Sequence, residues 1–269
     1  MTPLWRKSDV LQLGVDTPLI LERVPSELAH AVALLSQPQT RASLTHSLPD
    51  LDAVWIDWLL AQLTRANLVA TDRTATARDV CVVGSGKLAT ALVDALGEAG
   101  YSPVRRLASS TESWLYPGRA SHWADDKNPW GELTIVATHT AEPDRTLTDE
   151  LSRAGQAHMI VRLADDKAVV GPMVEPGLTP CVRCADMMRG SFDSAWPQLL
   201  AQLCRVNPDP PADLRSWAVA TAVLQVRARF DGVAAPDALG RVLQIDAADH
   251  VLTTMDLRPH PDCGCMGAW

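Results

Sequence analysis

The sequence predicts an α/β protein in which a small winged helix-turn-helix-like module precedes a larger domain built on a Rossmann-type sheet. At 269 residues the chain is close to two domains of ordinary size. An apolar run, a glycine turn and a helix pattern follow one another in residues 80–100, as in the first unit of a doubly wound sheet. Strand and helix patterns then alternate as far as residue 166, which is typical of parallel strands. We therefore expect a module at 1–76 and an α/β domain at 77–269.

The module is expected to contain short strands, three helices and a returning strand. Alternating apolar residues predict the strands, and apolar residues at helical spacing predict the helices. In order, the ranges are two strands within 10–24, helices at 26–37, 41–48 and 51–66, and a strand at 67–72. The polar residues 71–79 lack any periodicity, so they form the linker.

The α/β domain is expected to begin with a strand, a glycine turn and a helix, and to end with an antiparallel pair of strands. The expected strands are 80–84, 102–108, 132–140, 158–166, 241–246 and 250–257, and the expected helices are 86–99, 146–155, 195–204 and 214–232. Residues 109–131 are rich in turn formers and predict a loop. The proline- and glycine-rich segment 168–189 predicts a hairpin-like structure in which the motif CVRC opens no helix.

Charge and hydropathy exclude several classes of function. The chain has 24 Lys and Arg against 32 Asp and Glu, a net charge of −8, and no long basic run, so a nucleic acid is not expected as a partner. No stretch approaches the roughly 18 uninterrupted apolar residues of a membrane span, and the first residues lack an apolar secretion segment. We expect a cytoplasmic protein that binds neither nucleic acid nor membrane.

The charge of the module indicates what kind of ligand it takes. A winged-helix shape usually suggests DNA binding, which requires an excess of basic side chains. Residues 1–78 carry seven Lys and Arg against eight Asp and Glu. This near-neutral balance favours a protein or peptide ligand.

The glycine turn at Gly84-Ser85-Gly86 predicts a phosphate-binding type of strand-turn-helix unit. A nucleotide site of this kind usually has an Asp or Glu after the second strand, to hold the ribose hydroxyls. Here the second strand has no carboxylate and instead carries Arg105 and Arg106. Two interpretations stay open: an NADP site in which Arg105 holds the 2′-phosphate, or a retained fold with no nucleotide. We favour the second, because no hydride-transfer acid or base follows.

Four of the six cysteines form two closely spaced pairs, Cys181 with Cys184 and Cys263 with Cys265. Four thiolates suit a tetrahedral Zn²⁺, and a closed four-cysteine site is structural and not catalytic. A redox role for CVRC alone is the weaker alternative, because two pairs are present. Zinc would tie the C-terminus to the loop after the sheet. Cys81 and Cys204 lie in apolar surroundings and are expected in the core.

The module, the glycine-turn domain, the run GPMVEPGLTPCVRC and the terminal HPDCGC together resemble the ThiF-like proteins of ribosomal peptide natural-product clusters. Those proteins bind the leader of a precursor peptide and are partners of azoline-forming cyclodehydratases. The resemblance implies that the module is a precursor-peptide recognition element, in which a leader adds as a strand and lies against a helix. It assigns peptide binding to these residues: Leu19, Leu21, Val54, Trp55 and Trp58. It also implies a homodimer.

The resemblance extends to ATP-dependent adenylating enzymes, but the sequence departs from their pattern. Arg105 and Arg106 replace an acidic residue, and Ala137-Thr138-His139 stands where an aspartate is expected. We therefore expect no catalytic residues, and a scaffold that presents the peptide to a separate YcaO-type protein. The alternatives are an adenylating enzyme of the ThiF type, or an NADP-binding oxidoreductase that uses the turn at Gly84. The only cofactor expected is structural zinc.

Overall fold

A computed structural model describes residues 3–15, 18–37, 39–66, 68, 78–101, 104–107, 130–231 and 234–266. The chain divides into two compact units, Met1–Thr76 and Ala77–Trp269. Among the described helices, none is long and apolar enough to cross a membrane.

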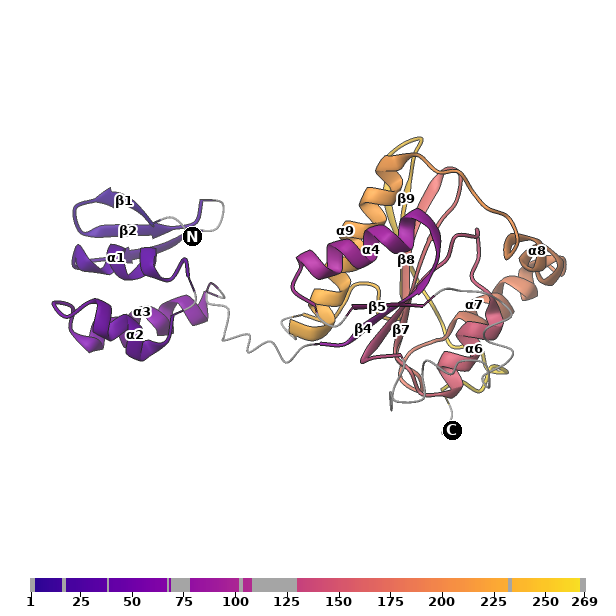
Figure 1. The fold of residues 1–269 in the computed structure, drawn as a ribbon, viewed down its shortest axis with the longest axis horizontal. Coiled ribbons are helices and arrows are strands. Elements are labelled where there is room, and N and C mark those ends of the chain that lie inside the picture. The colour runs from indigo at the N-terminus through magenta and orange to yellow at the C-terminus, as the bar shows by residue number, and fades with distance from the viewer. Residues whose placement is uncertain are drawn as a thin grey trace. The chain divides into compact units, whose positions relative to one another are not determined.

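The first unit contains a three-stranded antiparallel sheet and three helices (Figure 1). The middle strand is β2, so β1 and β3 are both edge strands. The elements are β1 (Pro3–Lys7), β2 (Val10–Leu13), β3 (Leu19–Glu22), α1 (Glu27–Leu34), α2 (Arg41–Ser47) and α3 (Ala53–Arg65). The sequence did not predict β1, because most of its residues are exposed and buried positions do not alternate with them. The strand predicted at 67–72 falls, except for Leu68, outside the described residues.

Capping side chains mark the starts of two helices of this unit, and its buried apolar residues form one core. Thr40 Oγ1 accepts the amide hydrogen of Ser43, and the Asp52 carboxylate accepts that of Val54, so α2 and α3 both begin at capping side chains. The sheet and the three helices all contribute to the core. Its buried members are Leu11, Leu13, Leu21, Val24, Leu28, Ala31, Val32, Leu44, Leu48, Leu51, Ile56, Leu59 and Leu63.

The second unit is built on a seven-stranded sheet with the strand order β10-β9-β8-β7-β6-β4-β5. The strands are β4 (Val80–Gly84), β5 (Val104–Leu107), β6 (Leu133–Ala137), β7 (His158–Leu163), β8 (Lys167–Val174), β9 (Arg241–Asp246) and β10 (Leu252–Asp256). Strands β5, β4, β6 and β7 are parallel, as the alternating pattern predicted. Strands β8, β9 and β10 extend the sheet in the antiparallel sense.

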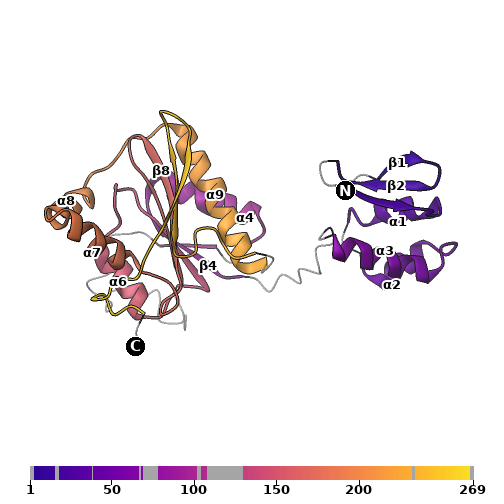
Figure 2. The same cartoon turned by 180° about the vertical axis from the view of Figure 1, so that it is seen from behind.

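Helices cover both faces of this sheet (Figures 1 and 2). They are α4 (Gly86–Glu98), α6 (Arg145–Arg153), α7 (Val182–Phe192), α8 (Trp196–Leu203) and α9 (Ala212–Asp231). On one face α4 and α9 pack against alternate strand residues, with Leu92 and Ala222 fully buried. On the other face α6 and α7 cover β4, β6 and β7, where Cys81 is buried as predicted. The mixed α/β class predicted from the sequence is confirmed.

Two predictions about cysteines are wrong. The motif CVRC lies at the start of α7, with Cys181 as the residue that precedes its first turn, and not in a hairpin-like loop. The prolines and glycines that favoured a loop end at Pro180, and the helix begins directly after them. Cys204 is half-buried at the end of α8 and not in the core, because α8 has no buried residue.

Candidate functional site

Four cysteines from two distant parts of the chain meet at one point of the second unit. Cys181 and Cys184 come from the N-terminal end of α7, and Cys263 and Cys265 from the last described residues. Their four sulfur atoms all lie within 4.8 Å of one another. The Sγ–Sγ distance is 4.0 Å between Cys181 and Cys184, 3.5 Å between Cys181 and Cys263, and 3.3 Å between Cys184 and Cys265. The structure therefore brings together all four residues that the sequence suggested as metal ligands.

This arrangement fits a tetrahedral zinc ion. Zn–S bonds of about 2.3 Å place the sulfur atoms of a four-cysteine site about 3.8 Å apart, and the separations given above lie on either side of that value. Val174 packs against the sulfurs, and three of the cysteines are buried, so the site is closed to substrates. Burial raises the pKa of the Cys181 thiol, and it raises the pKa of Cys263 to about 11. A divalent cation that binds here must therefore displace protons at neutral pH.

A network of ion pairs, largely removed from solvent, joins the start of α6 to α7 and α8. Arg145 donates from Nε and Nη2 to the two carboxylate oxygens of Asp186, at 2.5 and 3.0 Å, and from Nη2 to Glu142 at 2.9 Å. Asp186 also accepts the indole N–H of Trp196 at 3.1 Å. The guanidinium carbon of Arg189 lies 4.6 Å from the centre of the same indole ring. Sequence reasoning missed this network, because Arg145 and Asp186 are 41 residues apart and belong to no motif.

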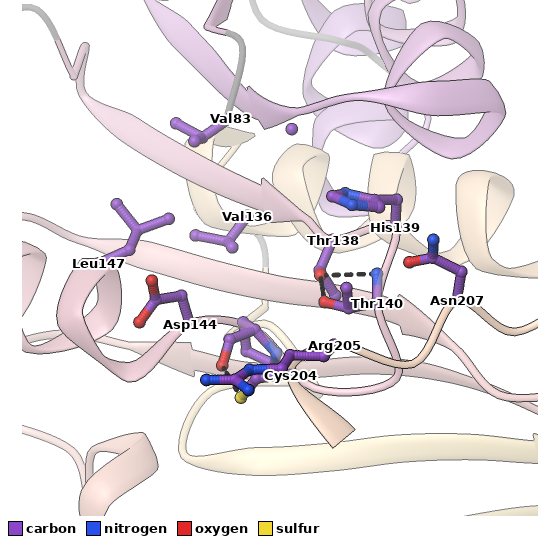
Figure 3. A pocket seen from close by; sticks show the side chains of 12 residues that line it. Val83, Val136, Thr138, His139, Thr140, Asp144, Leu147, Cys204, Arg205 and Asn207 are labelled. Carbon is purple, nitrogen blue, oxygen red and sulfur yellow. Dashed lines mark hydrogen bonds between the residues drawn. The ribbon is translucent and has the colours of Figure 1, made fainter. Parts of the chain in front are cut away.

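A cavity of about 260 Å³ opens at the carboxyl ends of the parallel strands β4 and β6 (Figure 3). In a doubly wound sheet, ligands bind where the strand order reverses, and β4 is that point here because β5 and β6 lie on its two sides. Residues after α8 complete the lining, and backbone hydrogen bonds hold them there: Ala141 N–H donates to Val206 O at 2.9 Å. The lining comprises Val83, Gly84, Val136, Thr138, His139, Thr140, Pro143, Asp144, Leu147, Cys204, Arg205 and Asn207.

The glycine turn lies beside this cavity. A Cβ at Gly84 would overlap the carbonyl oxygen of Ala137 on β6, so glycine is required for the close approach of the two strands. Gly86 has φ of +80°, a conformation that favours glycine at the start of α4. Ser85 Oγ lies 3.3 Å from Nδ1 of His139. The local backbone thus favours glycine at both positions, whether or not a nucleotide binds.

Few charged groups are found among the residues that line the cavity. Among the residues that line it, the only carboxylate is that of Asp144, whose Oδ1 accepts the amide hydrogen of Thr146 and so caps α6. Arg105 lies on β5, but its side chain is outside the described residues. The assignment of Gly84, Gly86 and Arg105 to a cofactor site stays a prediction.

The suggested peptide-binding residues lie on β3 and α3 of the first unit. Val54 is 70% exposed, and Leu19 is half-buried. Trp55 and Trp58 are half-buried and meet edge to face, with ring centres 5.5 Å apart. Leu21 is only 3% exposed and fills the core, because it alternates with exposed neighbours along β3. Only its backbone, at the edge of the sheet, is available to a ligand, and its assignment to peptide binding stays a prediction.

His158, the first residue of β7, is a buried titratable group outside these sites. Its Nδ1 lies 2.8 Å from the carbonyl oxygen of Gln156, so Nδ1 carries the proton and donates. Among the described residues its Nε2 has no hydrogen-bond partner. Burial lowers the pKa of His158 to about 4. The folded protein therefore holds this imidazole in its neutral form.

The neutral His158 predicts a loss of stability in weak acid. The unfolded chain binds a proton near pH 6.5 and the folded chain only near pH 4, so stability is full above pH 6.5 and falls as the pH drops toward 4. Between pH 7.5 and 5.5 the wild type is expected to lose about 1 kcal/mol more unfolding free energy than His158→Phe. Urea unfolding at both pH values measures this, with the exposed His250→Asn as control. An equal loss of unfolding free energy between the two pH values in wild type and His158→Phe would contradict the prediction.

Several solved structures share the described α/β fold. No family model and no curated protein matches the sequence, whereas solved structures do. A heterocyclase in complex with substrate and cofactor matches with a TM-score of 0.67 and 16% identity, over 98% of this chain and 38% of its own. The heterocyclase TruD matches with a TM-score of 0.62 and 17% identity, over 98% of this chain and 41% of its own.

A second group of matches has about the length of this chain. The microcin C7 biosynthetic enzyme MccB, in complex with N-formylated MccA, matches with a TM-score of 0.58 and 12% identity, over 98% of this chain and 97% of its own. E. coli MccB with ATP matches with a TM-score of 0.59 and 12% identity, over 99% of this chain and 98% of its own. This chain therefore shares the fold of both groups, and it spans about two-fifths of the two heterocyclases and nearly all of MccB.

Proposed function

We propose that this chain is a recognition and scaffold protein that binds the leader of a ribosomally made precursor peptide and presents it to a YcaO-type cyclodehydratase. The observation that carries the proposal is the match to two heterocyclase structures over 98% of this chain, a share that includes both units. The complex of MccB with MccA supports a peptide ligand, because MccB shares the fold over nearly its whole length.

The first unit offers the leader an exposed edge and an apolar helix face. Strand β3 is an edge of its sheet, so a peptide can pair with its backbone as a fourth strand. Helix α3 presents the exposed Val54 and the half-buried pair Trp55 and Trp58. Aromatic rings of this kind supply large contact areas in peptide recognition. We place the leader on these two elements of a winged-helix recognition module.

The four cysteines hold a structural zinc ion in this proposal. Cys181 and Cys184 anchor the start of α7, and Cys263 and Cys265 anchor the end of the described chain. One ion therefore ties together two segments that are about 80 residues apart, as the separations of 82 and 81 residues show. Because four protein ligands leave no open position, the ion supplies stability and no reaction chemistry.

The second candidate is an ATP-dependent adenylating enzyme. The ATP complex of E. coli MccB favours it, since MccB matches this chain from end to end. Against it stands the single carboxylate of the cavity lining, Asp144, which is already engaged as a helix cap. We therefore propose no catalytic residues. An NADP-binding oxidoreductase is the remaining alternative. We also propose that the chain forms a homodimer, as the resemblance to adenylating proteins implies.

Leader binding is expected to depend on Trp58. Fluorescence anisotropy with labelled leaders of the precursor peptides encoded beside the gene measures the dissociation constant. Trp58→Ala removes an aromatic contact on α3, and we expect the dissociation constant to rise about tenfold or more. Trp5→Ala is the matched control: Trp5 is 43% exposed on β1, the opposite edge of the same sheet, and its loss is expected to change binding less than about twofold.

Two results would contradict this proposal. The first is the absence of leader binding, or equal effects of Trp58→Ala and Trp5→Ala. The second is micromolar affinity for ATP with Mg²⁺ or for NADPH in calorimetric titrations, which would favour the enzyme candidates instead.

A further inference from the structure

Helix α8 presents an apolar face that the described part of the second unit covers only in part. Its four large apolar residues recur at positions i, i+3, i+4 and i+7, so they lie on one side of the helix: Trp196, Leu199, Leu200 and Leu203. No residue of α8 is buried, and Leu199 is 43% exposed. Phe192, at the end of α7, is 86% exposed, and Val206, just after α8, is 47% exposed. We call these six residues the α8 surface.

The α8 surface is held in place by polar contacts behind it. Trp196 donates its indole N–H to Asp186, and Arg189 stacks on the same ring. Asp186 is itself fixed by Arg145, and α7 begins at the cysteine cluster. In Figures 1 and 2 α8 lies at the outer end of α7, away from the sheet. A rigid apolar surface at the periphery has the properties of a protein interface, because little order is lost when a partner binds.

The charges near this surface favour a partner with acidic groups over a second copy of the chain. The exposed or half-buried charged residues along residues 183–206 are Arg183, Asp186, Arg189, Asp193 and Arg205. Asp186 is already paired with Arg145, and Arg189 lies 3.7 Å from Glu142, which leaves Arg183, Asp193 and Arg205. The local balance is therefore positive on a chain with a net charge of −8. Two copies that met through this surface would bring like charges together, whereas an acidic partner would neutralise them.

We infer that the α8 surface is the docking site for the cyclodehydratase subunit, a separate polypeptide with an apolar patch and an acidic rim. The inference rests on the proposed scaffold function. The length comparison supports this occupant: the heterocyclases match over 98% of this chain but only 38% and 41% of their own, so more than half of each heterocyclase lies outside the matched part. A separate polypeptide that supplies this remainder would need a binding surface on the matched part.

The test measures two binding reactions with the same proteins. Biolayer interferometry gives the affinity for the YcaO-type protein encoded beside the gene, and anisotropy gives the affinity for the labelled leader. Phe192→Glu and Leu199→Glu are expected to weaken the first affinity at least tenfold and to leave the second within about twofold. The matched control is Leu224→Glu, because Leu224 is 56% exposed on α9, on the other side of the sheet. We expect this control to bind both ligands like the wild type.

The possible outcomes distinguish the proposed docking site from the proposed scaffold function. Wild-type partner binding that Phe192→Glu and Leu199→Glu leave unchanged would overturn the docking site and keep the scaffold proposal. A wild type that binds the leader but no YcaO-type protein would overturn the scaffold proposal, and the docking site with it. A change of oligomeric state in Phe192→Glu, seen by light scattering with partner binding intact, would assign the surface to self-association and overturn the inference. Native zinc content confirms that each variant is folded.

Discussion

Cys184→Ser is expected to release the metal and to destabilise the second unit by on the order of 5 kcal/mol. Cys184 is fully buried, and its sulfur lies 3.3 Å from that of Cys265 and 4.0 Å from that of Cys181, so three remaining thiolates cannot close a tetrahedral site around zinc. Loss of the ion frees the last described residues and the first turn of α7 at once. Metal analysis is expected to show zinc falling from about one ion per chain to less than about a tenth.

The control for this variant is Cys204→Ser, which makes the same chemical change outside the cysteine cluster. Cys204 is half-buried, and its thiol donates to the carbonyl oxygen of Pro143 at 3.3 Å, a bond that a serine hydroxyl can replace. Cys204→Ser is expected to keep its zinc and to unfold within about 1 kcal/mol of the wild type. The zinc proposal fails if Cys184→Ser keeps its metal, or if freshly purified wild type contains less than about a tenth of an equivalent.

The parts of the structure that were predictable from sequence are those that local pattern determines. Alternating strand and helix patterns gave the four parallel strands, and the glycines at 84 and 86 marked the turn between β4 and α4. The spacing of Cys181 with Cys184 and Cys263 with Cys265 indicated two ligand pairs, and the structure places all four sulfurs together. In each case the signal lies within a few neighbouring residues, so no knowledge of the tertiary structure is needed.

Features that depend on tertiary contacts were not predictable in this way. The strand β1 has mostly exposed residues, and only its pairing with β2 makes it a strand. The helix that begins after Cys181 follows a run of prolines and glycines that by itself favours a loop. Leu21 has an apolar side chain that would suit a ligand contact, but its position on the inner face of β3 places that side chain in the core. These differences arise because burial and pairing are decided by distant segments.

Arg145→Met is expected to destabilise the second unit by about 3–5 kcal/mol, because it leaves the Asp186 carboxylate without a cation in a mostly buried site, whereas Glu142 keeps Arg162 at 3.2 Å. The Arg145 side chain is 17% exposed, and those of Asp186 and Glu142 are 14% and 8% exposed. Burial alone would lower the pKa of the Arg145 guanidinium, but Asp186 and Glu142 outweigh burial and raise it above its ordinary range. The three groups therefore stabilise one another's charges, and removing the cation withdraws two hydrogen bonds from Asp186.

A much smaller effect is expected for an exposed ion pair in the same unit. Arg241 Nε lies 2.5 Å from Asp256, as close as Arg145 Nε is to Asp186, but the Asp256 side chain is 71% exposed. Water solvates Asp256 when its partner is removed, so Arg241→Met is expected to cost no more than about 1 kcal/mol. Urea unfolding of both variants, followed by a probe in the second unit, measures the difference. Equal losses would show that burial does not determine the strength of the Arg145 network, and would also weaken the argument that Asp186 and Arg189 hold Trp196 and α8 in a fixed position.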